Sequence, residues 1–394
     1  MGAYQKQKCV MIIAGEASGD LHGSKLVLAM REKNNELFFC GIGGQALREA
    51  GVKIIVDASL LSVVGISEVF SKMPGLFRGM SAAKKLIKSL KPDLLIIIDF
   101  PDFNLHVAAA AKKTGIPVLY YISPQLWAWR PGRVKKIKKL VDHVAVILPF
   151  EEDFYKAHQV RVSFVGHPLL DTHVAAEESL TAANTEDIPV VGLLPGSRDR
   201  EIARLLPVML QSARILLKRD NRIKFIISAA LSVKRKFVET IVEQHRGNYD
   251  FEVVSQPVER VLTRCRLAVV ASGTATLETA IYGVPMIIIY RISPLTYWLG
   301  RMLVRSRVKY FGLVNLIADR EISPELLQGE ASPEKIADMA FEILNDASRL
   351  GKMKSDLLAL KDMLGGPGAS LRVANIALNM LEKSETNAEN KRQT

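Results

Sequence analysis

Cysteine is scarce in this sequence, which has only Cys9, Cys40 and Cys265 among its 394 residues. So few thiols, so far apart, supply neither a disulfide framework nor a zinc cluster, and a reducing compartment is the expected setting. Long hydrophobic runs are also lacking, because no window approaches the roughly 20 uncharged apolar residues that cross a bilayer. The first apolar segment, CVMIIA, ends in a Gly/Asp loop, which is typical of a buried strand and not of a signal peptide. We therefore expect a cytoplasmic protein.

Several catalytic motifs are missing as well. The sequence has no Walker A segment, no His-Glu-x-x-His pair and no close set of cysteines and histidines, which argues against P-loop and zinc chemistry. It also has no Asp-x-Asp triplet, so a sugar nucleotide held through a metal is not indicated. We expect neither a metal nor another cofactor.

Acidic residues are outnumbered, with 41 Asp and Glu against 53 Lys and Arg, and the net charge is +12. This excess favours a polyanionic partner, which could be nucleic acid, an anionic membrane surface or a phosphorylated substrate. Two basic clusters, at 130–139 and 291–309, stand beside apolar and aromatic residues. Because no recognised nucleic-acid-binding module accompanies them, we expect no nucleic acid. The charge alone leaves an anionic membrane surface and a phosphorylated substrate open.

Short apolar runs alternate with longer amphipathic stretches along most of the chain. Continuous apolarity is typical of parallel strands buried on both faces, so the alternation predicts an α/β fold with doubly wound sheets. The predicted strands are 10–14, 36–40, 94–99, 118–122, 143–148, 162–165, 190–194, 223–228, 267–271 and 286–290, and clear helices are 21–33, 80–89, 105–113 and 201–217.

A polar, irregular stretch after GHPLLD separates two βα series, the second of which begins at VVGLLPGSR. This break predicts a first domain at 1–170, a second at 171–340 and a helical C-terminal segment with a polar tail at 341–394. A cleft between the two α/β halves is the expected site.

Two features of the first half could serve chemistry. Asp99 ends a buried strand, where a carboxyl group among apolar neighbours can act as a general base; the alternative is a cap on the next helix. The loop 15–20, GEASGD, follows the first strand and offers Glu16, Ser18, Gly19 and Asp20 to a ligand. Its alternative is a tight turn with Asp20 as a cap.

The second half has two loops of the kind that binds anions. Gly196, Ser197 and Arg198 open a helix and suit a diphosphate, through backbone donors and a guanidinium. Ser272, Gly273 and Thr274 form a similar junction. Glu278, one turn into the following helix, could accept hydrogen bonds from ribose hydroxyls, or it could be a surface glutamate that the helix dipole favours.

The stretch 60–80 is rich in aliphatic residues and too short to span a membrane. It fits an interfacial element that dips between lipids, or an ordinary core strand and helix. The residues that would contact lipid are Val63, Val64, Ile66, Val69, Phe70, Leu76 and Phe77.

Eleven segments, spread in order over nearly the whole chain, closely resemble lipid A disaccharide synthases. The matching segments are GEASGD (15–20), GIGG (41–44), SVVGISEV (62–69), IDFPDFN (98–104), YYISPQLWAWRPGRVKKI (120–137), VGHPLLD (165–171), LLPGSR (193–198), SGTATLE (272–278), YRISPLTYWLGRMLV (290–304), GLVNLI (312–317) and PELLQ (324–328). The resemblance implies a GT-B fold, in which two Rossmann-like domains face a cleft and the C-terminal helices return to the first domain.

The resemblance also implies an inverting glycosyltransferase that joins UDP-2,3-diacylglucosamine to 2,3-diacylglucosamine 1-phosphate (lipid X) through a β-1,6 linkage. Such an enzyme works on the inner face of the cytoplasmic membrane without a metal. Asp99 would be the general base, Glu16, Ser18 and Asp20 would line the acceptor side, and Ser197 with Arg198 would hold the UDP diphosphate. Ser272, Gly273, Thr274 and Glu278 would complete the nucleotide site, with Asn315 and Gln328 near it.

Other functions stay open at this point. A second kind of UDP-sugar enzyme with the same fold, such as a MurG-like transferase or a UDP-N-acetylglucosamine 2-epimerase, shares the SGTATLE type of loop. A non-enzymatic, basic lipid- or nucleotide-binding module is the other alternative. The aliphatic segment 60–77 and the WAWRPG stretch favour an acylated substrate and the membrane-associating interpretation. The sequence leaves the oligomeric state open.

Overall fold

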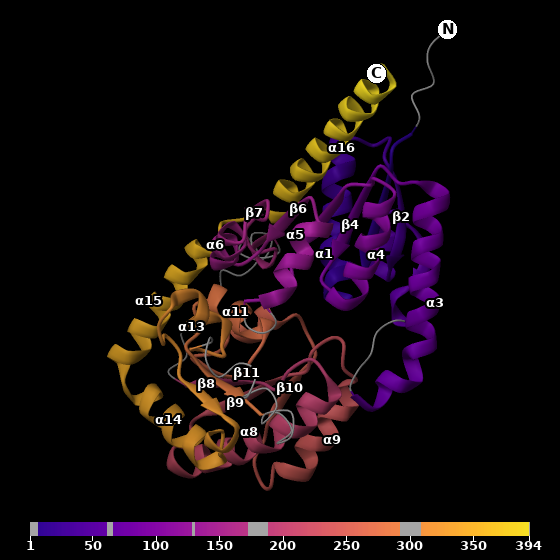
Figure 1. Ribbon diagram of the computed structural model, residues 1–394. Helices are drawn as coiled ribbons and strands as arrows, with labels where there is room; N and C mark the ends of the chain where they lie inside the picture. Colours follow the sequence, from indigo (N-terminus) through magenta and orange to yellow (C-terminus); the bar gives the residue numbers. More distant parts are fainter. Residues whose placement is uncertain (1–6, 61–65, 128–130, 172–187, 292–308, 394) are drawn as a thin grey trace. The chain divides into compact units, whose positions relative to one another are not determined.

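The computed structural model describes residues 7–60, 66–127, 131–171, 188–291 and 309–393, with the backbone alone described at 60, 66–74, 131 and 384–393. The chain forms two compact units, each built around one parallel sheet (Figure 1). The first unit comprises the residues up to Asp171 and those from Gly365 onward, and the second comprises Thr172–Leu364.

In the described part of the first unit, seven parallel strands run in the order β3-β2-β1-β4-β5-β6-β7. The strands are β1 (Cys9–Ala14), β2 (Phe38–Gly43), β3 (Lys53–Asp57), β4 (Leu94–Ile98), β5 (Val118–Tyr121), β6 (His143–Val146) and β7 (Val162–Phe164). The helices are α1 (Ala17–Lys33), α2 (Gln45–Glu49), α3 (Ile66–Leu90), α4 (Pro101–Lys113), α5 (Val134–Leu140), α6 (Pro149–Ala157) and α16 (Ala369–Gln393), with 3-10 turns at Ala58–Leu60 and Pro131–Arg133.

The strands of this sheet are apolar on both faces because helices cover both. Met11 and Ile13 of β1 are buried in a cluster with residues of α3, α4, α5 and α6. Val10 and Ile12 are buried in a second cluster, with residues of α1 and α16. The alternation follows from the two-residue period of a strand, and it explains why the sequence reads as continuous apolar runs.

In the described part of the second unit, six parallel strands run in the order β10-β9-β8-β11-β12-β13. The strands are β8 (Val190–Leu194), β9 (Lys224–Ser228), β10 (Glu252–Val254), β11 (Leu267–Ala271), β12 (Met286–Tyr290) and β13 (Glu325–Leu327). The helices are α8 (Asp199–Arg219), α9 (Arg235–His245), α10 (Val258–Leu262), α11 (Thr274–Ile281), α13 (Leu313–Ala318), α14 (Pro333–Asn345) and α15 (Ala347–Met363), with a 3-10 turn at Gln328–Glu330.

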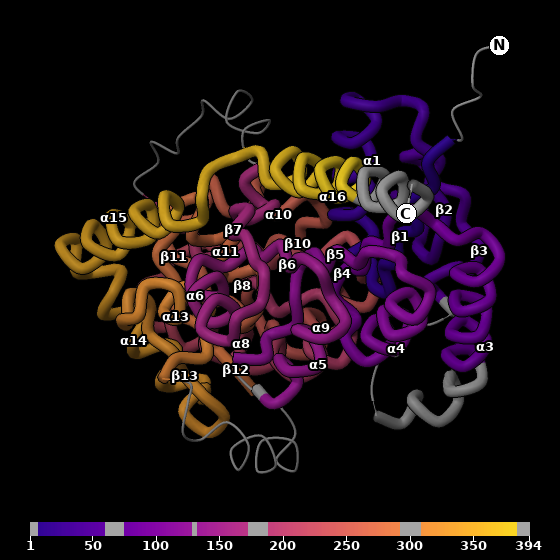
Figure 2. Tube along the Cα trace, turned by 45° about the horizontal axis from the view of Figure 1, so that its top comes forward, coloured from indigo at the N-terminus to yellow at the C-terminus, as the bar shows by residue number. Residues whose placement is uncertain are grey.

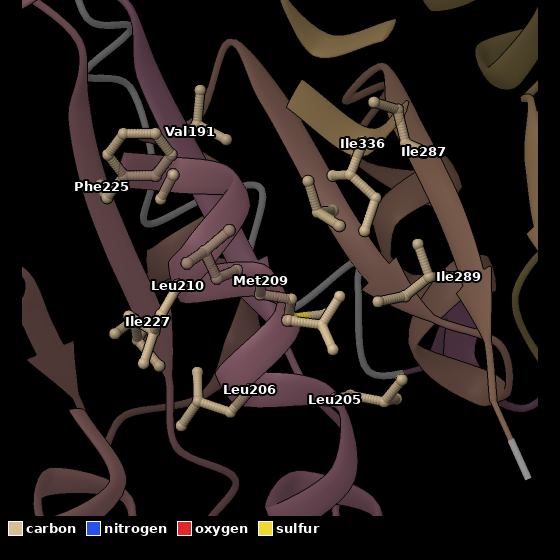
Figure 3. Close-up of a cluster of buried hydrophobic side chains, with 14 of the residues drawn as sticks. Val191, Leu205, Leu206, Met209, Leu210, Phe225, Ile227, Ile287, Ile289 and Ile336 are labelled. Carbon is tan, nitrogen blue, oxygen red and sulfur yellow. The ribbon is translucent and has the colours of Figure 1, made fainter. Parts of the chain in front are cut away.

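The largest buried cluster of the second unit lies between the sheet and α8 (Figure 3). Leu206 and Met209 of α8 are buried there with Phe225 and Ile227 of β9 and with Ile336 of α14. Burial of this apolar helix face fixes α8 on the sheet. This packing also holds in place the start of α8, which directly follows the loop after β8.

Three strands were not predicted from the sequence, and all three stand at or beside the outer limits of the sheets. β3 and β10 are edge strands, and β13 closes the opposite edge of the second sheet. An edge strand has one strand neighbour and is less covered, so its sequence need not be apolar throughout. Lys53–Asp57, for example, has no fully buried residue.

The C-terminal helices do not stay together, in contrast to the predicted segment 341–394. Helices α14 and α15 contact α8 and α11 within the second unit, whereas α16 lies against α1 in the first (Figure 2). The chain turns between them at Gly365, Gly366 and Gly368, whose φ angles are 86°, 67° and 93°. Only glycine adopts such angles without strain. This glycine turn marks the boundary between the second unit, which ends at Leu364, and the returning part of the first. A C-terminal helix that returns to the first domain, as the resemblance implied, is confirmed.

Asp171 fixes the start of the returning helix. Its carboxylate accepts hydrogen bonds from the N–H groups of Gly368 (2.7 Å), Ala369 (3.0 Å) and Ser370 (3.1 Å) and from the Ser370 hydroxyl (2.9 Å). Although burial opposes ionisation, these hydrogen bonds from Ser370, Ala369 and Gly368 hold the pKa of Asp171 below its usual value. The cap therefore joins two positions almost 200 residues apart in sequence.

We expect Asp171→Asn to loosen α16, because the amide NH₂ cannot accept the bonds that the second carboxylate oxygen receives. The loss should be about 1–2 kcal/mol in the opening free energy of α16, measured by hydrogen exchange of its backbone amides. Since the native pKa is depressed, the stabilisation is present at neutral pH and disappears as the pH falls through the acidic range. Asp346→Asn is the control, because Asp346 caps α15 through a single bond from the Arg349 N–H. Equal protection of α16 in Asp171→Asn and in the wild type would contradict the assignment.

Candidate active site

The predicted residues of the first unit lie where the order of its strands reverses. From β1 the chain proceeds to β2 and β3 on one side, whereas β4 pairs with β1 on the other. Loop 15–20 follows β1 and Asp99 follows β4, so both stand at the carboxyl edge of neighbouring strands. This is the position at which open α/β sheets bind ligands.

The backbone of Asp99 is held from both sides in an unusual conformation. Its φ is 45°, in the left-handed region that non-glycine residues seldom adopt. Its N–H donates to the carbonyls of Tyr121 (3.3 Å) and Ile122 (3.2 Å). Its carbonyl accepts from the Asn104 amide (2.6 Å) and the Tyr120 hydroxyl (2.9 Å). Strain that the surroundings impose in this way is a common property of functional positions.

The environment of Asp99 makes its carboxyl group a weaker acid. Burial raises the pKa to about 6, and the negative charge of Glu16 adds to this, while the N–H of Phe100 acts in the opposite direction. A carboxyl group with this pKa is mostly ionised near neutral pH and still basic enough to take a proton. The geometry thus suits a general base.

Segment 15–20, in which the predicted loop gives way to the first turn of α1 at Ala17, packs against the residues that follow β4 and β2. A Cβ at Gly15 would lie 2.4 Å from the Phe100 ring, so only glycine fits. Asp20 is 6% exposed, and its carboxylate accepts from the N–H groups of Gly44 (2.5 Å) and Ala46 (2.9 Å) at the start of α2. Asp20 is therefore a cap, as the alternative held, but of α2 and not of its own helix.

The remaining residues of this loop differ in exposure. Glu16 and Ser18 are exposed, whereas Gly19 is buried with Ile98 and Ala14 in van der Waals contact range of a Cβ placed there. Glu16 and Ser18 can reach a ligand, and Gly19 lets helix α1 approach the sheet. That any of these residues, or Asp20, contacts an acceptor stays a prediction.

The second unit repeats this arrangement. Strands β8 and β11 are neighbours, with Val191 opposite Leu267 and Leu194 opposite Val270, and the strand order reverses between them. The loops that follow, 195–198 and 272–274, therefore stand side by side at the carboxyl edge. The structure brings together the two loops that the sequence suggested for a diphosphate.

The turn at Gly196 and Ser197 is built around a carboxylate. Gly196 has a φ of 111°, and a Cβ there would lie 2.2 Å from an oxygen of Glu201. That oxygen accepts from the Ser197 N–H at 3.2 Å, and the Ser232 hydroxyl donates to the Ser197 carbonyl at 3.1 Å. Arg198 is exposed and directly precedes α8, so its guanidinium can reach an anion at the helix start.

The second loop leaves its glycine and hydroxyl accessible. The Ser272 hydroxyl donates to the Phe311 carbonyl at 3.3 Å. Gly273 and Thr274 are exposed, and a Cβ at Gly273 would meet nothing within 4 Å. Glu278 is partly buried on α11, and burial, then the charge of Glu259, raises its pKa.

Asn315 and Gln328 lie near the edge strand β13. The fully buried Asn315 amide donates to the Ser323 carbonyl and to Glu325 (2.7 Å each) and accepts from the N–H groups of Ile322 and Ser323. These bonds give it a structural role. Gln328 has a φ of 53° at the end of β13. Contact of either residue with a nucleotide stays a prediction.

Sequence reasoning missed several residues that hold the site. Tyr120 lies inside an apolar strand and gave no signal of its bond to Asp99. Asn104 lies in the IDFPDFN segment, but its role depends on the fold. Glu201 could have been found, because a glutamate at the third helical position is typical of a capping box.

The predicted lipid-contacting residues are only partly described. Val63 and Val64 lie outside the described residues, and Ile66, Val69 and Phe70 lie in α3 where the backbone alone is described. Leu76 is half-buried and packs against the core of the first unit. Phe77 is 65% exposed. Of the two predicted lipid-contacting side chains that the structure describes, Phe77 is therefore the one that can reach a membrane.

No group of three or more His, Cys, Asp or Glu side chains among the described residues could hold a metal ion. In the same part of the chain, no helix has the length and apolarity to cross a bilayer.

Known structures share this fold. The UDP-GlcNAc 2-epimerase of Neisseria meningitidis has a TM-score of 0.65 at 11% identity and covers 94% of this chain and 100% of its own. MurG of Acinetobacter baumannii has a TM-score of 0.59 at 14% identity, with 94% and 99% covered. At these identities the likeness concerns the fold alone, and it confirms the prediction of a GT-B-like α/β architecture.

Sequence comparison is more specific. The profile of the family described as Lipid-A-disaccharide synthetase matches residues 10–371. Lipid-A-disaccharide synthase of Syntrophus aciditrophicus is 47% identical over 385 residues, which is 96% of this chain and 99% of the relative. The same enzyme of Coxiella burnetii is 40% identical over 378 residues, with 95% and 99% covered. The chain belongs to the lipid-A-disaccharide synthase family.

Proposed function

We propose that this chain joins UDP-2,3-diacylglucosamine to lipid X, giving the β-1,6-linked disaccharide 1-phosphate and UDP. Lipid-A-disaccharide synthase activity, a glycosyl transfer in lipid A biosynthesis, is the activity of its family, and these are the substrates that it implies. The acceptor would bind at the carboxyl edge of the first sheet and the nucleotide at that of the second. The observation that supports this most is Asp99, a partly buried carboxyl group of raised pKa at the strand reversal.

In the proposed step, the Asp99 carboxylate takes the proton of the acceptor 6-hydroxyl as its oxygen attacks C1 of the donor sugar. The bond from C1 to the UDP oxygen breaks, and its electron pair leaves with UDP. A single in-line displacement inverts the configuration at C1. Because Asp99 has a pKa of about 6, it is mostly ionised at neutral pH and ready to accept this proton.

The leaving UDP would be stabilised by the second unit. Arg198 would hold the diphosphate through its guanidinium and Ser197 through its hydroxyl, because the Ser197 N–H already donates to Glu201. Gly196 would allow the turn. Ser272, Gly273 and Thr274 would offer further donors from the adjacent loop. Glu278 would accept from the ribose hydroxyls. Since Arg198 supplies positive charge at the diphosphate, we propose a reaction without a metal cofactor.

We also propose that the first unit associates peripherally with the anionic inner face of the cytoplasmic membrane. Among the side chains of α3, α4 and α5 that the structure describes, the acid is Asp102, which pairs with Arg133. Exposed or half-exposed lysines of these helices are Lys84, Lys85, Lys88, Lys112, Lys113, Lys135, Lys136, Lys138 and Lys139. This basic layer, with the exposed Phe77, suits attraction to acidic headgroups followed by insertion of an aromatic side chain.

Asp99→Asn should reduce disaccharide formation by roughly 10²- to 10⁴-fold, because the amide cannot take the proton. UDP affinity should be unchanged, since the nucleotide loops belong to the other unit. The assay uses UDP-diacylglucosamine and lipid X in EDTA, where the wild type should keep its full rate. Asp153→Asn, an exposed position on α6, is the control. Turnover near the wild-type rate in Asp99→Asn would remove Asp99 from this role, and strict loss in EDTA would overturn the metal-free reaction.

The pH profile should report Asp99 directly. Because the base must be ionised, kcat/KM should fall as the pH drops below an apparent pKa of about 6. The charge of Glu16 contributes to the raised pKa, so Glu16→Gln should move this acidic limb to lower pH. An unmoved or upward-shifted limb in Glu16→Gln would show that another group sets the profile.

Membrane binding should depend on salt. Vesicles of phosphatidylglycerol should capture the protein at 0.1 M salt and release it as salt rises, because screening weakens each headgroup contact. Lys135→Ala/Lys136→Ala should weaken binding roughly 30-fold, because each lysine near the surface contributes about 1 kcal/mol. The matched control is Lys234→Ala/Lys236→Ala, a pair of exposed lysines in the second unit. Binding that is indifferent to salt, or an equal loss in the control, would leave the basic layer without this function.

A further inference from the structure

Glu151 is a buried acid for which the proposed step has no use. It is 1% exposed and stands in the first turn of α6, directly after β6. Glutamate is seldom buried so completely without a positively charged partner. Here no cation of the described residues compensates its charge, and its neighbours are hydrogen-bond donors. Such a position calls for a role.

The carboxyl group of Glu151 joins two segments that are distant in sequence. One oxygen accepts from the Leu148 N–H at 3.2 Å, within the start of its own helix. The other accepts from the Trp127 indole N–H at 3.2 Å, on the loop that follows β5. The Trp127 ring meets Phe150 edge-on, with 4.9 Å between centroids and an interplanar angle of 89°. The indole is thus fixed both by a hydrogen bond and by packing.

The loop that carries Trp127 begins beside the proposed base. The N–H of Asp99 donates to the carbonyls of Tyr121 and Ile122, where β5 ends and the loop starts. Beyond the loop, Arg133 pairs with Asp102 of α4 at 2.6 Å. Between these attachments, Leu126 is buried in the core cluster that contains Tyr155 of α6, and Ser123 also meets Tyr155. The Trp127 indole adds a directed hydrogen bond to α6 at the far end of the loop.

We propose that Glu151 is a positioning residue for the acceptor sugar, acting through Trp127 to hold residues 122–127 at the edge of the site next to Asp99. This inference rests on the proposed function, because it assigns the acceptor to the first unit. Glu151 does not itself touch the reacting atoms. Its effect is expected on acceptor binding and not on the nucleotide.

The protonation of Glu151 bears on this contact. Burial raises its pKa to about 7, while hydrogen bonds from Leu148, Trp127 and Ile147 oppose the rise. The groups that face it are Tyr155 on its own helix, which feels its charge, and the indole of Trp127, which does not titrate. Above pH 7 both oxygens accept, and below it one becomes a hydroxyl donor. The affinity for the acceptor should therefore be higher on the alkaline side.

The test measures KM for lipid X and for UDP-diacylglucosamine in three variants. Trp127→Phe keeps the aromatic packing and loses the indole N–H, and Glu151→Ala loses the acceptor. Both should raise KM for lipid X roughly tenfold, with KM for the UDP-sugar within twofold of the wild type. Glu151→Gln keeps one acceptor and replaces the other with a donor, as protonation does. It does not titrate, so it should show at every pH the KM for lipid X that the wild type shows on the acidic side, and the change of that KM around pH 7 should disappear. Asp153→Ala, the exposed neighbour on α6, is the control.

Several outcomes would overturn the inference. A wild-type KM for lipid X in Trp127→Phe would show that the indole contact does not position the acceptor. Equal increases of both KM values, or a KM for lipid X in Glu151→Gln that still changes around pH 7, would indicate a general structural role. Thermal unfolding of each variant identifies misfolding. If Glu151→Ala is unstable, the KM values of Trp127→Phe decide the test. Failure of the proposed function is recognised separately, since it would appear as turnover in Asp99→Asn whatever the Trp127 result.

Discussion

Burial of parallel sheets on both faces is the constraint on which this structure depends. A parallel strand must be joined to its neighbour by a crossover, and the helices of these crossovers cover both faces of the sheet. All carboxyl ends then emerge at one edge. Where the strand order reverses, the helices diverge and leave that edge accessible. The same constraint acts twice in this chain, once between β1 and β4 and once between β8 and β11, and each reversal holds one set of candidate residues.

The two edges differ in their electrostatics in a way that suits their proposed partners. At the first, a partly buried carboxyl group with a carboxylate neighbour is made more basic, which fits proton abstraction from a hydroxyl. At the second, the exposed Arg198 supplies positive charge beside the loop of the exposed Gly273 and Thr274, which suits a negatively charged group. A transfer reaction needs both properties, one where the nucleophile loses a proton and one where the leaving group gains charge. Because the two environments belong to different units, the electrostatic potential at each edge is set by the residues of its own unit.

How far the sequence predicts this structure depends on how local each signal is. The apolar runs of β1, β4, β8 and β11 identify buried strands by themselves, and the glycine-containing loops after them identify the site. Asp99 is predicted because it ends such a run. Tyr120, Asn104 and Asp171 are different, because their partners are set by the fold; Asp171 meets residues almost 200 positions away. Edge strands such as β3 escape prediction because a half-covered strand does not need a continuous apolar sequence.

The returning helix has a consequence for the order in which the protein is made. Val373, Ala374, Ala377 and Leu381 of α16 are buried in the same cluster as Val10, Ile12 and Leu26. During synthesis from the N-terminus, the whole second unit emerges before these residues do. The face of the first sheet that α1 only partly covers therefore faces water until the last segment leaves the ribosome. A ribosome that stalls or terminates before residue 369 releases a chain with an open apolar surface, so aggregation and proteolysis, more than loss of catalysis, determine the fate of truncated products.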